Sequence, residues 1–215
     1  MKVAVFDVCG TLYDSNTTFD FLDGYFHNDR KYQLFRRFSR SLPGKIVNYP
    51  FYRFFNYDII RVIATSFLKD ISEEKLQVAM KHFVYHELDS KVKIDIQKLL
   101  HQYKEEGYVI YLMSGSYSLL VEQVCQYFKA DAFTGSELEM VNSQCTGRYA
   151  TDQLFNKKAV LLEKYPDIQE LVVVSDNRTD YELMKMADKG FAVCNKPKQT
   201  LFWQSRQLEN VEILN

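Results

Sequence analysis

The sequence predicts an α/β protein with a doubly wound parallel sheet and a helical segment inserted after the first strand. Three observations predict this fold. Four short apolar runs each end in polar residues, helical patterns lie between the runs, and one long segment, residues 15–90, breaks the alternation. Strands that alternate with helices form a parallel sheet covered on both faces.

The four predicted strands cover residues 3–6, 109–113, 171–174 and 190–194. They are apolar without alternation, which is typical of strands buried on both faces. Apolar residues recur at helical spacing in residues 94–106, 119–128, 157–164 and 181–187. Ligands of doubly wound sheets bind beyond the carboxyl ends of the strands. Asp7, Ser114 and Asp176 follow three of the predicted strands and are therefore expected at that edge.

Residues 15–90 are expected to form a helical cap. They contain no convincing buried strand, but aromatic-rich helical patterns cover residues 18–26, 59–68 and 73–85. The predicted organisation is a core of residues 1–14 and 91–215 with a cap of residues 15–90.

The composition indicates a globular protein of 215 residues, with 47% apolar residues, 26% charged residues and a net charge of −1. No run approaches the roughly 18 apolar residues that span a bilayer. The first residues turn polar too soon for a signal peptide. The four cysteines are far apart in the sequence and form no C-x-x-C pair, so free thiols in a reducing cytoplasm are expected.

The residues at the strand ends match the needs of phosphoryl transfer. An Asp ends the first strand, a Ser the second, a Lys begins a later helix, and two Asp follow another strand. A carboxylate attacks phosphorus, a cation neutralises phosphate oxygens, and hydroxyl or backbone donors bind the other oxygens. Further carboxylates suit Mg²⁺, which prefers oxygen ligands.

These motifs, in this order, resemble those of the haloacid dehalogenase (HAD) superfamily, in the branch with phosphoserine phosphatase and a helical cap. The motif D-x-D-G-T is matched by residues 7–11 except at its third position, which is Cys9. The strand ending in Ser or Thr is matched by residues 112–116, and the motif G/S-D-x-x-x-D by residues 175–180. The motif lysine is best matched by Lys158, with the adjacent Lys157 as the alternative.

The resemblance implies a Mg²⁺-dependent phosphatase with a HAD-like Rossmannoid core. Asp7 is the expected nucleophile, and Lys158 and Asp180 are the expected supporting catalytic residues. The expected metal ligands are the Asp7 and Asp176 side chains and the backbone carbonyl of Cys9. The expected phosphate-binding residues, besides Lys158, are Thr11, which also braces the turn, Ser114 and the Gly115 amide, with Ser116 as an alternative to Ser114.

Cys9 departs from the family pattern. In family phosphatases the carboxylic acid at this position protonates the leaving oxygen and then activates water. A thiol has an ordinary pKa of about 8.5, and the nearby Asp7 disfavours its thiolate. General acid–base catalysis contributes about 10²–10⁴-fold, so a slow phosphatase is expected. The alternatives are a phosphonate or haloacid hydrolase, a phosphotransferase, and a phosphate-ligand binding protein with little turnover.

Residues 30–57 contain seven Lys or Arg, nine Phe or Tyr, and no acidic residue. One interpretation is a cap helix pair that buries its aromatic residues and exposes its charges. The other is a surface that receives an anionic substrate, such as a lipid or aromatic phosphate ester, or makes peripheral membrane contact. Nucleic acid is not an expected partner, because the chain as a whole is not basic.

Overall fold

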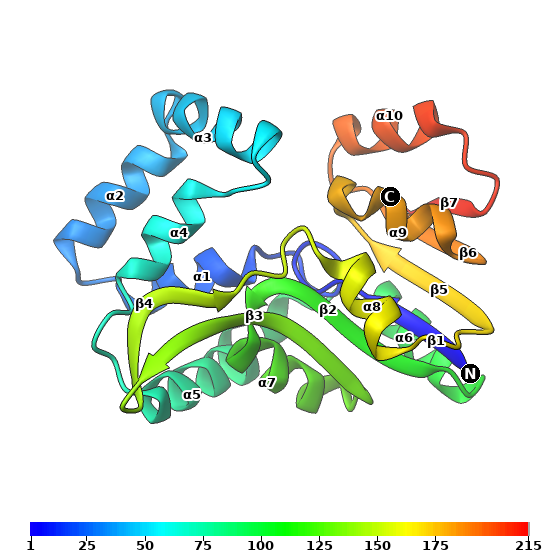
Figure 1. Cartoon of the computed structure of the whole chain (residues 1–215), viewed down its shortest axis with the longest axis horizontal. Coiled ribbons are helices and arrows are strands. Elements are labelled where there is room, and N and C mark those ends of the chain that lie inside the picture. The colour runs from blue at the N-terminus through cyan, green and yellow to red at the C-terminus, as the bar shows by residue number, and fades with distance from the viewer. Residues whose placement is uncertain (215) are drawn as a thin grey trace.

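The computed structural model describes residues 1–214, which form one seven-stranded sheet with the order β4-β3-β2-β1-β5-β6-β7 (Figure 1). The strands are β1 (Lys2–Phe6), β2 (Val109–Tyr117), β3 (Ala132–Val141), β4 (Gln144–Thr151), β5 (Glu170–Ser175), β6 (Lys189–Val193) and β7 (Val211–Leu214). Neighbouring strands are parallel except for the antiparallel pair β3–β4. The predicted parallel α/β sheet is confirmed.

Helices of the described chain lie on both faces of this sheet and above its carboxyl edge (Figure 1). They are α1 (Thr17–Tyr25), α2 (Arg30–Arg40), α3 (Leu42–Phe54), α4 (Ile59–Ser66), α5 (Glu73–His82), α6 (Ile94–Glu105), α7 (Ser118–Phe128), α8 (Lys157–Lys164), α9 (Tyr181–Met186) and α10 (Pro197–Arg206). Short π and 3₁₀ segments cover Phe83–Glu87, Asp89–Lys91 and Arg178–Asp180. No helix within residues 1–214 is both long and apolar enough to cross a bilayer.

Alternate residues of the central strand enter two separate hydrophobic cores. Ala4 and Phe6 pack with residues of α5, α6 and α7, whereas Val3 and Val5 pack with residues of α8, α9 and α10. Successive side chains of a strand point to opposite faces. This explains why β1 is apolar at every position and why helices cover both faces.

The sequence missed three strands and placed one strand end wrongly. β3 and β4 contain several polar residues among their apolar ones, and β7 is a short edge strand, so none is a continuous apolar run. β2 was expected to end before Ser114 but continues to Tyr117. Its pairing with β3 shifts register between Met113 and Tyr117, and such an irregularity lets a polar segment remain in the strand.

The segment after β1 divides into two parts in space. α2, α3 and α4 stand above the carboxyl edge of the sheet, while α5 lies beneath the sheet beside α7 (Figure 1). The turn before α5 is tied to the β3–β4 hairpin, since Asp70 N donates to Cys145 O at 2.8 Å. The helices above the carboxyl edge are therefore α2, α3 and α4.

Candidate active site

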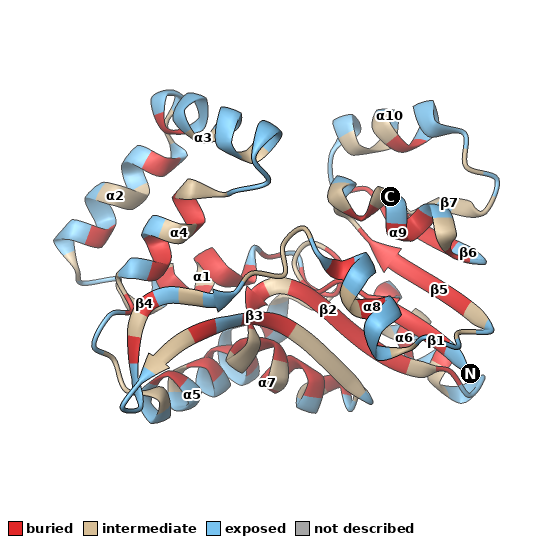
Figure 2. Ribbon diagram, viewed as in Figure 1, coloured by how far each residue is buried: buried red, intermediate tan, exposed pale blue. Residues whose placement is uncertain are grey.

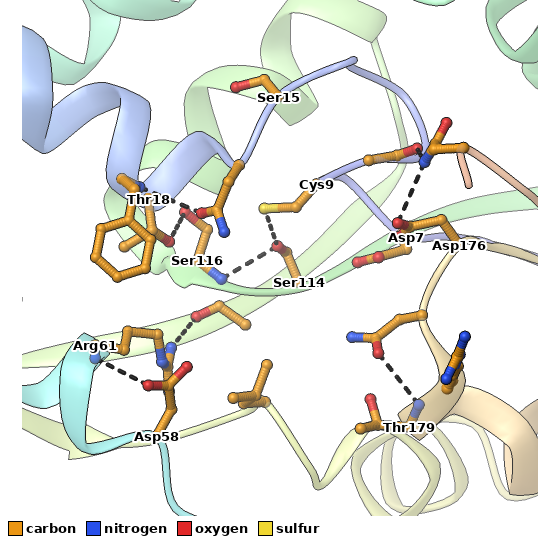
Figure 3. A pocket seen from close by; sticks show the side chains of 18 of the residues that line it. Asp7, Cys9, Ser15, Thr18, Asp58, Arg61, Ser114, Ser116, Asp176 and Thr179 are labelled. Atoms are coloured by element: carbon orange, nitrogen blue, oxygen red, sulfur yellow. Dashed lines mark hydrogen bonds between the residues drawn. The ribbon is translucent and has the colours of Figure 1, made fainter. Parts of the chain in front are cut away.

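Asp7 lies at the centre of the site because β1 is the central strand. Phe6 pairs with Leu112 of β2 and with Val174 of β5, and Asp7 N donates to Val174 O at 2.9 Å. These two registers bring Asp7, Ser114 and Asp176 to one edge, as predicted. They line a cavity of about 780 Å³ between the sheet edge and the cap (Figure 3).

Lys157 is the lysine that reaches Asp7. Its Nζ donates to Asp7 Oδ1 at 2.8 Å and to Asp180 Oδ2 at 2.7 Å, and all three side chains are buried. Lys158 points away and lies 3.8 Å from Glu182 at the surface. Adjacent residues of a helix point roughly 100° apart, so only one of the two can face Asp7. The expected position Lys158 is therefore corrected to Lys157.

The charges of this group shift one another's pKa. Burial raises the pKa of Asp7 to about 7; the Lys157 ammonium lowers it in part, and the Asp180 and Asp176 carboxylates raise it further. Burial alone would lower the pKa of Lys157, but the Asp180 and Asp7 carboxylates raise it above its ordinary value. Lys157 is therefore a fixed positive charge at neutral pH.

A second carboxylate is held beside Asp7 by the turn after β1. Thr11 Oγ1 accepts from Asp176 N at 2.9 Å and donates to Asp176 Oδ1 at 3.4 Å. Gly10 has a φ of +71°, and a Cβ there would lie 2.4 Å from Asp176 Oδ2. Glycine is thus required at position 10 for two reasons: the backbone conformation there and the close approach of Asp176.

Two residues that the sequence analysis did not select also contact Asp176. Asn195 Nδ2 lies 3.3 Å from Asp176 Oδ2, and Gln199 Nε2 donates to the Asp176 carbonyl at 2.8 Å. Asn195 follows β6, the fourth predicted strand, so the rule that ligands bind at strand ends could have found it. Gln199 lies within α10 and carries no comparable signal.

The Ser114 side chain lies at the wall of the cavity. Its Oγ accepts from Ser116 N at 3.1 Å, so its own proton is free to point elsewhere. Ser116 is the less suitable alternative, because its Oγ accepts from Thr17 Oγ1 at 3.2 Å and from Thr18 Oγ1 at 2.9 Å. Gly115 borders the same cavity, where a Cβ would lie 2.9 Å from Leu154 Cδ1.

Cys9 points toward Ser114 (Figure 3). Its Sγ lies 2.8 Å from Thr17 Oγ1 and 3.7 Å from Ser114 Oγ. Burial raises the pKa of the Cys9 thiol, and the Asp7 carboxylate raises it further. The group at this position is therefore a protonated thiol at neutral pH.

Arg61 of α4 fastens the cap to the core and was not found from the sequence. It is 4% exposed, forms an ion pair with Asp152, donates to the Gly115 carbonyl, and stacks 4.6 Å from the Tyr149 ring centroid. A single arginine in an amphipathic helix gives no sign that it is buried. Its role depends on partners from other elements.

The carboxylates of the site fit a magnesium ion. Asp7 and Asp176 are hard oxygen donors, and their mutual repulsion contributes to the raised pKa of Asp7. Among residues 1–214, no three His, Cys, Asp or Glu side chains gather as a complete side-chain metal site. Mg²⁺ is ordinarily held by one or two carboxylates plus waters and other oxygen atoms, so two carboxylates suffice.

The fold and the site together define a class of hydrolase. A seven-stranded α/β sheet carries an aspartate after its central strand, a lysine forms an ion pair with that aspartate, and a second aspartate lies beside it. The sequence matches the haloacid dehalogenase-like hydrolase family over residues 4–185. The chain belongs to this HAD family.

Individual proteins are similar to this chain in sequence or in fold. The chain is 27% identical to a phosphoserine phosphatase of Methanocaldococcus jannaschii over 138 residues, which cover 61% of this chain and 62% of that protein. A protein of unknown function from Bordetella pertussis Tohama I has a similar structure, with a TM-score of 0.79 at 16% identity over 100% of this chain and 98% of that one. A phosphoserine phosphatase carrying a phospho-aspartyl intermediate analogue has a TM-score of 0.63 at 21% identity, covering 99% and 91% of the two chains.

Proposed function

We propose that this chain is a Mg²⁺-dependent phosphomonoesterase in which Asp7 forms an aspartyl phosphate. The observation that carries the proposal is the buried hydrogen-bonded chain from Asp7 through Lys157 to Asp180, at 2.8 and 2.7 Å. Buried charges are retained where they are paired and used. The M. jannaschii relative is a phosphoserine phosphatase, which supports the same chemistry.

Asp7 is positioned as a nucleophile. Among residues 1–214, its carboxylate accepts a side-chain hydrogen bond from Lys157 alone, through Oδ1. Oδ2 is left to attack phosphorus. The Lys157 ammonium lies where it neutralises both this carboxylate and a phosphate oxygen brought next to it.

Asp7, Asp176 and the Cys9 carbonyl would hold Mg²⁺, whose charge would draw electron density from the phosphate oxygens. Thr11, Asn195 and Gln199 orient Asp176 through the hydrogen bonds described above. Partners that orient a ligand in this way commonly control metal affinity.

Two bonds to phosphorus change in each half of the proposed reaction. In the first, a bond forms from Asp7 Oδ2 to phosphorus, the bond from phosphorus to the leaving oxygen breaks, and that oxygen takes a proton from solvent. In the second, a bond forms from a water oxygen to phosphorus, the water gives a proton to solvent, the bond from phosphorus to Asp7 Oδ2 breaks, and inorganic phosphate leaves. The Ser114 hydroxyl donates a hydrogen bond to a phosphate oxygen in both halves of the reaction.

The test is phosphate release from a broad panel of phosphomonoesters, with Mg²⁺ and with EDTA, for the wild-type chain and for Asp7→Asn. Asp167→Asn is the matched control, because Asp167 is an exposed aspartate. We expect Mg²⁺-dependent release that is lost in Asp7→Asn and kept in Asp167→Asn. Release that persists in Asp7→Asn, or that EDTA does not affect, would contradict the mechanism.

Phosphotransfer is a second candidate, favoured by Cys9. A thiol with a raised pKa is a poor base for water, so the aspartyl phosphate has time to react with another acceptor. Adding an acceptor alcohol to the assay distinguishes the two reactions. Phosphotransfer gives a phosphorylated alcohol at the expense of inorganic phosphate, while simple hydrolysis leaves the phosphate yield unchanged.

A further inference from the structure

The α2–α3 hairpin of the cap, residues 30–57, has an exposed apolar surface. Six apolar side chains of α3 are exposed: Leu42, Ile46, Val47, Tyr49, Phe51 and Phe54. Leu42, Phe54 and the following Phe55 keep 71%, 73% and 72% of their surface. α2 adds Leu34 and Phe38, and Figure 2 shows both helices mostly exposed. Exposed apolar side chains that gather on two neighbouring helices mark an interaction site.

The inward face of α3 carries a glycine and two polar side chains, whereas an ordinary surface helix turns its apolar residues inward. Gly44, Asn48 and Tyr52 are the less exposed residues, at positions i, i+4 and i+8. A Cβ at Gly44 would lie 2.3 Å from the Phe38 carbonyl oxygen, so glycine allows α3 to approach α2 closely. Asn48 Nδ2 donates to Asp58 Oδ1 at 3.1 Å, and the Tyr52 ring packs 5.2 Å from that of Phe155. Packing within the chain therefore leaves the apolar side chains outward.

The same hairpin carries unpaired positive charge. Of its seven cations, Arg36 and Arg40 form ion pairs with Asp23. The other five are exposed and form no ion pair with any residue in 1–214: Arg30, Lys31, Arg37, Lys45 and Arg53. No acidic residue occurs between Arg30 and Tyr57. The occupant of this surface must therefore offer negative charge and an apolar interior.

We propose that the α2–α3 hairpin docks on an anionic lipid bilayer. Exposed apolar side chains interspersed with Lys and Arg are the pattern of a helix that lies in the membrane interface. Each Lys or Arg near such a surface adds attraction to anionic headgroups. A second copy of this chain is disfavoured, because a two-fold contact would place cations against cations with no acid from the hairpin between them.

Docking would hold the active site beside the membrane. The hairpin also contributes Arg36, Lys45 and Tyr49 to a second cavity of about 590 Å³. Asn16 and Tyr52 line both this cavity and the one that contains Asp7. The docking surface therefore borders the second cavity, with Lys45 and Tyr49 belonging to both, although the docking proposal does not depend on the phosphatase proposal.

The test is flotation of the full-length chain with vesicles of phosphatidylcholine containing phosphatidylglycerol, compared with vesicles of phosphatidylcholine alone. We expect binding to the anionic vesicles that weakens with added salt. The double substitution Phe54→Ser/Phe55→Ser should lower the partition coefficient at least about tenfold, because two apolar anchors are lost. The matched control Val78→Ser/Leu201→Ser removes two apolar side chains, each 65% exposed, from other surfaces and should bind as the wild type does.

A comparison of two charge-reversal variants isolates the electrostatic contribution to vesicle binding. Arg37→Glu/Arg53→Glu should reduce binding to anionic vesicles about tenfold or more, since the net charge of residues 30–57 falls from +7 to +3 and their attraction to the headgroups weakens. Lys69→Glu/Lys185→Glu makes the same change in net charge at exposed sites elsewhere and should bind normally. Circular dichroism checks that each variant is folded, and hydrolysis of p-nitrophenyl phosphate without vesicles should be equal in all four.

Tryptophan fluorescence of a Phe54→Trp variant tests docking while an apolar side chain is kept at position 54. Its emission should shift to the blue on addition of anionic vesicles, while Leu201→Trp should not respond. Absence of binding to anionic vesicles, or equal binding to neutral ones, would overturn the proposal. So would a concentration-dependent dimer that Phe54→Ser/Phe55→Ser converts to a monomer, because the surface would then belong to a second copy.

Discussion

The Lys157 ammonium lies 2.8 Å from the Asp7 carboxylate and joins the end of the central strand to the start of α8. The same nitrogen lies 2.7 Å from Asp180, whose carboxylate also accepts from Ser175 Oγ at 2.6 Å. Asp7 is therefore held by a cation that is itself fixed from the opposite side. The buried group of Asp7, Lys157 and Asp180 therefore holds the proposed nucleophile in place at the end of β1.

Replacement of Lys157 tests which lysine serves Asp7. Lys157→Ala should lower kcat/KM for phosphomonoesters about 10²–10³-fold, because a preorganised charge next to the phosphate is lost. Lys158→Ala should change it less than about twofold, since Lys158 is at the surface beside Glu182. Steady-state kinetics of the two variants make the comparison, and a larger effect at Lys158 would contradict the geometry.

Cys9→Asp should speed hydrolysis of esters with poor leaving groups. The thiol is a weaker acid–base group than a carboxyl, so wild-type rates should fall steeply as the pKa of the leaving alcohol rises. A carboxyl at position 9 should recover at least about tenfold for alkyl phosphates, within the 10²–10⁴-fold range of general acid–base catalysis.

The measurement is kcat/KM over a series of aryl and alkyl phosphates for wild type, Cys9→Asp and Cys9→Ala. A shallower dependence on leaving-group pKa only in Cys9→Asp supports the interpretation. An unchanged slope would mean that another group supplies the proton.

Asp7→Asn should stabilise the metal-free protein at high pH. The pKa of Asp7 is raised to about 7 by burial, against about 4 in the unfolded chain. The folded state therefore favours the protonated form, so the charged form costs stability from about pH 4 upward, and the cost is complete above about pH 7.

Thermal unfolding in EDTA measures this effect. The melting temperature of Asp7→Asn should exceed that of the wild type by roughly 2–4 °C at pH 8, as a change of about 1 kcal/mol produces in a chain of this size. The gain should vanish near pH 4, and Mg²⁺ should raise the wild-type value more than that of the variant. A gain that does not depend on pH would not come from the titration of Asp7.

Arg61→Met should destabilise the protein by about 3 kcal/mol, because it breaks a buried ion pair and leaves Asp152 and the Gly115 carbonyl without their cation. Arg148→Met is the control, since Arg148 is an exposed arginine on the same strand as Tyr149. Urea unfolding of both variants provides the comparison. Equal stabilities would mean that the Arg61 contacts do not hold α4 to the sheet.

The sequence by itself determined which residues meet at the sheet edge. Asp7, Ser114 and Asp176 follow apolar runs, and parallel strands bring their carboxyl ends to one edge, so their proximity could be predicted without coordinates. The order of the motifs also identified the family, which the match over residues 4–185 confirms.

Only the tertiary structure decided what depends on the orientation of one element against another. Lys157 and Lys158 are equivalent in the sequence, and the rotation of α8 about its axis selects Lys157. Arg61 became a buried anchor because β2 and the segment after β4 supply its partners. The apolar side chains of α3 look like core residues in the sequence, yet Gly44, Asn48 and Tyr52 face inward and leave them in solvent. Local pattern determines which residues form an element, but contacts between distant segments determine which side of that element is buried.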